Sequence, residues 1–142
     1  STNPFWGMGA IEKWRGQDMT LQECYQNLGG DFTQLKQRFP SVQMVKRIIT
    51  KFLEDKTISE LCHAIENERG KDAFLAAYTL QGVCANLCFD KLLASTVQMT
   101  ALISPETNTI TENCYLFLEA VKQDYKLTVS SIRTYLDSEH EE

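Results

Sequence analysis

Cysteine and histidine are the side chains in this sequence whose types could bind a metal ion or act as nucleophiles. The chain of 142 residues contains five cysteines and two histidines, and no Cys-x-x-Cys pair occurs. Cys84 and Cys88 are four residues apart, a spacing that would place two thiols on one face of a helix. A structural zinc site needs four ligands, and the remaining candidates lie at no recognised spacing: Cys24, Cys62, His63, Cys114 and His140. We therefore expect no metal site and no cofactor, and we interpret the cysteines as small buried hydrophobic residues.

The sequence also lacks the residue sets that enzymes commonly use. It contains no Ser-His-Asp set, phosphate-binding loop or carboxylate pair, so we expect no enzymatic activity. The odd number of scattered cysteines favours a reducing compartment, which predicts a cytoplasmic protein. No apolar run approaches the roughly 20 residues of a membrane-spanning helix. The formal net charge of −5 excludes the broad cationic surface of a nucleic-acid binder.

Basic residues are nevertheless concentrated in one short segment. Five of them lie between positions 36 and 51, namely Lys36, Arg38, Lys46, Arg47 and Lys51. We interpret this cluster as a solvated helix face rather than as an anion-binding site.

The elements that must position these residues are all predicted to be helices. Apolar residues recur at three- and four-residue steps, and no stretch alternates long enough to indicate a sheet. Short helices are expected before position 41, where Gly29 and Asp31 provide a stop and a cap. Longer helices are expected over 41–55, 57–68, 72–87, 89–103 and 109–137. Their core should include Phe52, Leu61, Leu80, Leu87, Leu93, Phe117 and Val121.

The helix boundaries are predicted from capping residues. Ser41 is expected to cap the first long helix, and the loss of phase near position 56 predicts a break or kink. Capping boxes are expected at 57–60 and 109–112, where Thr and Glu would each satisfy a free backbone N–H. Short connections favour an up-down antiparallel four-helix bundle with short N-terminal helices. The expected organisation is an N-terminal tail (1–17), the bundle (18–137) and an acidic C-terminal tail (138–142).

One predicted helix carries a recognisable pattern. Positions 76–87 read Ala-Ala-Tyr-Thr-Leu-Gln-Gly-Val-Cys-Ala-Asn-Leu. This segment closely resembles the signature of histidine-containing phosphotransfer (HPt) domains, Ala-His-Thr-Leu-Lys-Gly-x-x-x-Asn-Leu. The segments 28–31 (Leu-Gly-Gly-Asp) and 52–55 (Phe-Leu-Glu-Asp) are similar to that family too, so the resemblance covers roughly residues 21–103. It implies a four-helix bundle that acts in two-component signalling and binds response-regulator receiver domains.

Two departures from the family pattern change the expected chemistry. Tyr78 stands where the resemblance implies the phosphorylated histidine, and Gln81 stands where it implies a lysine, whereas Gly82 is kept. A neutral imidazole is a good nucleophile near neutral pH, but a phenol is almost entirely protonated there. Gln81 also supplies no positive charge to phosphoryl oxygens. The expected protein therefore binds a receiver domain and carries no phosphate.

The helix spacing defines a candidate partner-binding face. Tyr78, Gln81, Gly82 and Ala85 share one side of the helix, and Phe74 is included as part of the same face. Leu80, Val83 and Leu87 are expected to point toward the core. Several alternatives remain open. Gly82 could serve close packing inside the protein or be inherited without a role of its own. The protein could transfer phosphate through Tyr78 or another acceptor, or it could be a helical scaffold with an unrelated partner.

Overall fold

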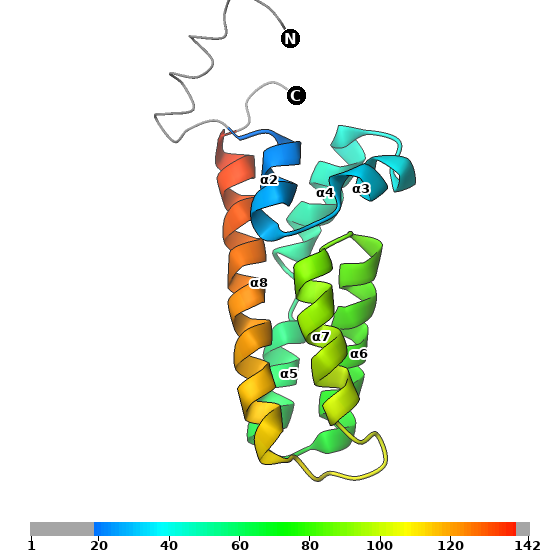
Figure 1. The fold of residues 1–142 in the computed structure, drawn as a ribbon, viewed down its shortest axis with the longest axis vertical. Helices are drawn as coiled ribbons and strands as arrows, with labels where there is room; N and C mark the ends of the chain where they lie inside the picture. The colour runs from blue at the N-terminus through cyan, green and yellow to red at the C-terminus, as the bar shows by residue number, and fades with distance from the viewer. Residues whose placement is uncertain (1–18, 139–142) are drawn as a thin grey trace, which may run out of the picture.

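The computed structural model describes residues 19–138, and every regular element in this part of the chain is a helix (Figure 1). Its helices are α2 (Leu21–Leu28), α3 (Phe32–Arg38), α4 (Val42–Phe52), α5 (Thr57–Glu66), α6 (Gly70–Asn86), α7 (Asp90–Leu102) and α8 (Glu112–Ser138). The predicted all-α class is confirmed. The predicted tail 1–17 and residues 139–142 of the predicted acidic tail lie outside the described residues. Within residues 19–138, no helix is long and apolar enough to cross a membrane.

The short N-terminal helices begin and end at local signals. Asp31 caps α3 and Ser41 caps α4, each through a side-chain oxygen that accepts a backbone N–H three residues later, as predicted. Gly29 ends α2 in the left-handed conformation, at a φ of 78°. Thr20 and Glu23 form a capping box at the start of α2 that the sequence analysis missed.

The break before α5 is present, but its predicted capping box is wrong. Thr57 is the first helical residue rather than the cap, and its backbone N–H donates to Asp55 Oδ1 at 2.6 Å. The Asp55 carboxylate thus binds the backbone N–H of Thr57 that the Glu60 side chain would have bound in a capping box. The second predicted box is also wrong, because α8 begins at Glu112 and not near position 109.

The core follows the predicted helix faces with two exceptions. Of the predicted core residues, five are buried: Phe52, Leu61, Leu80, Leu87 and Val121. Leu93 and Phe117 are only half-buried at the edge of the core, and the adjacent Leu92 and Leu118 are buried instead. One residue corresponds to about 100° around a helix. In both helices the predicted core position is therefore displaced by one residue from the buried one.

The long helices pack in the order in which they occur along the chain. Contacts join α5 to α6, α6 to α7 and α7 to α8, and α2 packs against the C-terminal half of α8 (Figure 1). The backbone N–H of Met19 donates to Ser138 Oγ at 2.9 Å, which fixes the start of α2 to the end of α8.

A residue other than glycine adopts the left-handed conformation at each end of α6. These residues are Glu68, with a φ of 53°, and Cys88, with a φ of 59°. At the end of α5, Glu68 N–H donates to Ile65 O and Arg69 N–H donates to Ala64 O, the pattern in which glycine is usual. Because Glu68 is exposed, its side chain gains little from packing to offset the left-handed backbone.

Replacing Glu68 with glycine is therefore expected to raise the free energy of unfolding by about 0.5–1 kcal/mol. The same replacement at Glu66, an exposed residue in the right-handed last turn of α5, should lower it by about 0.5–1 kcal/mol. Urea denaturation of the two variants provides the comparison. Destabilisation by both replacements would show that the backbone at Glu68 is not strained.

Candidate functional site

Helix α6 carries the candidate partner-binding face, and it packs between α5 and α7. Its inner side is buried and, apart from Leu80, consists of small residues, namely Gly70, Ala73, Ala76, Ala77 and Cys84. Small side chains let the neighbouring helices approach closely, and they leave the opposite side of α6 facing solvent. The predicted orientation is correct for Leu80 and Leu87, which are buried, whereas Val83 is half-buried.

The five predicted partner-binding residues lie on the outward side of α6, with different exposures. Tyr78 is 59% exposed, Gly82 and Ala85 are exposed, and Phe74 and Gln81 are half-buried. The rings of Phe74 and Tyr78 stack with an interplanar angle of 7° and a centroid separation of 6.0 Å. The two residues therefore form one aromatic pair on the surface of α6.

The surroundings of Gly82 distinguish between close packing inside the protein and an open surface at this position. A Cβ built at this position meets no atom within 4 Å in the described structure. Close packing inside residues 19–138 therefore does not explain why a glycine occupies an exposed helix position, where it costs about 1 kcal/mol relative to alanine. The absence of a side chain leaves the backbone of α6 open to approach from outside.

Sequence reasoning missed one member of this face, Leu75. It is 63% exposed and lies next to Phe74 in the chain. An exposed leucine alone is ordinary, and the sequence did not show that this one would lie outside the buried side of α6. Together with Phe74 and Tyr78, Leu75 forms an apolar area on the outward side of α6.

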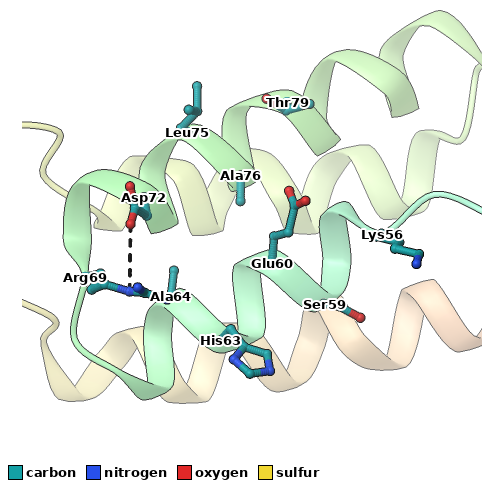
Figure 2. Close-up of a pocket in the computed structure, with 10 residues that line it drawn as sticks. All are labelled: Lys56, Ser59, Glu60, His63, Ala64, Arg69, Asp72, Leu75, Ala76 and Thr79. Carbon is teal, nitrogen blue, oxygen red and sulfur yellow. Dashed lines mark ion pairs between the residues drawn. The ribbon is translucent and has the colours of Figure 1, made fainter.

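A groove between α5 and α6 lies beside this apolar area (Figure 2). Its volume is about 580 Å³. Leu75, Ala76 and Thr79 line it from α6, and Ser59, Glu60, His63 and Ala64 line it from α5. Arg69 and Asp72 form an exposed ion pair of 3.8 Å at one end. Charges of both signs line the groove, and His63 points away from α6 (Figure 2).

The turn between α6 and α7 is held by the segment that joins α2 to α3. Asp31 N–H donates to Cys88 O, and Lys91 N–H donates to Gly29 O. Gly30 permits this close approach, because a Cβ there would lie 2.7 Å from Cys88 O. Tyr25 also donates through its hydroxyl to Leu87 O at 2.8 Å. The Gly-Gly-Asp segment thus positions the C-terminal end of α6.

Arg38 is a second residue that sequence reasoning did not assign to this region. Its Nη1 donates to the backbone oxygens of Ala85 and Asn86, at 2.7 and 2.8 Å. The sequence analysis interpreted the basic cluster as a solvated helix face. For Arg38 this interpretation is incomplete, because the side chain crosses from α3 to the last turn of α6.

The buried thiols of Cys84 on α6 and Cys24 on α2 are poor candidates for nucleophiles. Burial, with a smaller contribution from Asp55, raises the pKa of Cys84 to about 12, and burial raises the pKa of Cys24 to about 12. These thiols stay protonated near neutral pH, and the thiolate is the form that attacks or binds metals. Over residues 19–138, no group of three His, Cys, Asp or Glu side chains is placed to hold a metal ion.

No protein-family model, curated protein or solved structure matches the chain.

Proposed function

We propose that the chain is a degenerate HPt-like protein that binds a response-regulator receiver domain in the cytoplasm and does not carry phosphate. It would hold a receiver domain or compete for one in two-component signalling. In this proposal α5, α6, α7 and α8 form an up-down antiparallel four-helix bundle. α6 takes the position of the helix that carries the phosphorylated histidine in the family.

The order and direction of the helices support the bundle assignment. Each of the four helices packs against the next in the chain. In Figure 1 the chain runs down α5, up α6, down α7 and up α8. The turns on either side of α6 are short, as expected for antiparallel neighbours.

The observation that carries the proposal is the combination of an open Gly82 with an exposed apolar area one turn away. Phe74, Leu75 and Tyr78 supply that area, and aromatic residues at the centre of a face are common anchors in protein interfaces. The face therefore has the features of a docking surface. It lacks the imidazole at position 78 and the amine at position 81 that phosphoryl transfer would need.

Gly82→Gln separates docking from stability. The open space around Gly82 accommodates the larger side chain, so the variant should be about 0.5–1 kcal/mol more stable to unfolding. The same side chain would stand between α6 and a docked partner, so affinity should fall at least about tenfold. We would test receiver domains from the source organism by calorimetry and compare denaturant melts of the same proteins.

Ala120→Gln is the matched control, because Ala120 is an exposed helical residue on α8. It should leave receiver binding unchanged. Full affinity in the Gly82→Gln variant would place the interface elsewhere. A panel in which no receiver domain binds the unmodified protein would instead favour a helical scaffold with an unrelated partner.

A further inference from the structure

Arg38 places a fixed cation at the C-terminal end of the candidate partner-binding face. The backbone oxygens of Ala85 and Asn86 that accept from Nη1 belong to the last turn of α6. The carbonyl groups of a last turn have no partner within the helix, and they form the negative end of its dipole. The charge of Arg38 is therefore held at one place although the residue is exposed.

The geometry of the guanidinium leaves its other edge available. The group has five N–H donors in a rigid plane, and the two on Nη1 suffice for the two carbonyl oxygens. Within residues 19–138, the Nε and Nη2 donors of Arg38 hydrogen-bond to no other described residue. This edge is the fork that binds a carboxylate through two parallel hydrogen bonds.

The segment that carries Arg38 is positively charged. Positions 32–53 contain five basic residues and no acidic residue, although the whole chain has a net charge of −5. Lys36, also on α3, extends over the Phe32 ring at 5.2 Å. Asp31, seven residues before Arg38 in the chain, caps the start of α3 by accepting from Gln34 N–H.

We propose that Arg38 is the anion contact of the α6 face, and that it binds an aspartate or glutamate side chain of the docked receiver domain. This inference rests on the proposed function. Gly82 and Ala85 are separated by about 4.5 Å along the helix axis, so a protein that covers Gly82 reaches the free edge of Arg38. Because α6 already orders the Arg38 side chain, the contact needs little further loss of side-chain freedom. The face thus selects partners in which an acidic residue borders an apolar area.

Association kinetics of the receiver domain found in the panel provide the test. Arg38→Gln should lower the association rate about three- to tenfold at low ionic strength and flatten its dependence on salt. Arg38→Lys keeps the positive charge but loses the forked pair of N–H donors. Its association rate should therefore lie between those of Arg38→Gln and the unmodified protein. Lys126→Gln removes one exposed cation from α8 and makes the same change in net charge, and it should leave the rate unchanged.

A second variant guards against a purely structural effect of Arg38. Lys36→Gln leaves the contacts of Arg38 with α6 in place. It should reduce the salt dependence of the association rate without changing the melting temperature of the protein. Equal rates for Arg38→Gln and the unmodified protein would overturn the proposal, as would equal losses in Arg38→Gln and Lys126→Gln. Arg38-dependent binding of a labelled DNA duplex in place of the receiver would overturn it too. If no receiver domain binds the unmodified protein, the proposed function itself fails.

Discussion

Replacing Leu80 with alanine is expected to lower the free energy of unfolding by about 2–5 kcal/mol. Leu80 is completely buried in the middle of α6. Its truncation removes apolar contacts and leaves a cavity that the surrounding helices fill only in part. Urea or guanidinium denaturation monitored by circular dichroism measures the loss directly.

Leu75→Ala is the matched control, since it makes the same chemical change five residues earlier on the same helix. Leu75 is 63% exposed, so its replacement should change the free energy of unfolding by no more than about 0.5 kcal/mol. Similar losses in the two variants would mean that the inward and outward sides of α6 are assigned incorrectly. The proposed docking face would then lose its basis.

Introducing histidine at position 78 together with lysine at position 81 is expected to create a phosphate acceptor. Tyr78 is exposed and Gly82 leaves the space above α6 open, so a phosphorylated receiver could bring its acyl phosphate to an imidazole at this position. The P–O bond of the acyl phosphate would break as a P–N bond forms. Tyr78→His alone should act slowly, and adding Gln81→Lys should raise the rate at least about tenfold, because a cation stabilises the phosphoryl oxygens.

Transfer of radioactive phosphate from a phosphorylated cognate receiver measures this gain. The unmodified protein and the Gln81→Lys variant serve as controls, and neither should acquire acid-labile phosphate. Labelling of the unmodified protein would contradict the inactive assignment and favour an active phosphotransfer protein. A double variant that folds and binds the receiver but stays unlabelled would limit the resemblance to the fold.

Local signals in the sequence predicted most helix boundaries. Asp31 and Ser41 cap their helices as expected, because a cap depends on residues only three positions apart. The predicted box at Thr57 was wrong because Asp55 competes for the same backbone donor. Both arrangements are compatible with the local sequence, and pattern alone does not rank them.

The candidate site was predicted only where it depends on helix periodicity. The spacing placed Tyr78, Gly82 and Ala85 on the outward side of α6, where the structure has them. The contribution of Arg38 could not be predicted, because it depends on α3 lying across the end of a helix whose contacted residues are 47 and 48 positions later in the chain. Such contacts depend on tertiary packing, and the hydrophobic periodicity of the sequence does not predict them.

The hydrogen bond between Met19 and Ser138 has a consequence for the order in which the chain assembles. The two residues are 119 positions apart, whereas α5, α6, α7 and α8 each pack against a neighbour in sequence. Closing a longer loop costs more chain entropy, and contacts between distant segments slow folding. The neighbouring helices can therefore pair first, and α2 completes the structure by docking on an α8 that is already held in place.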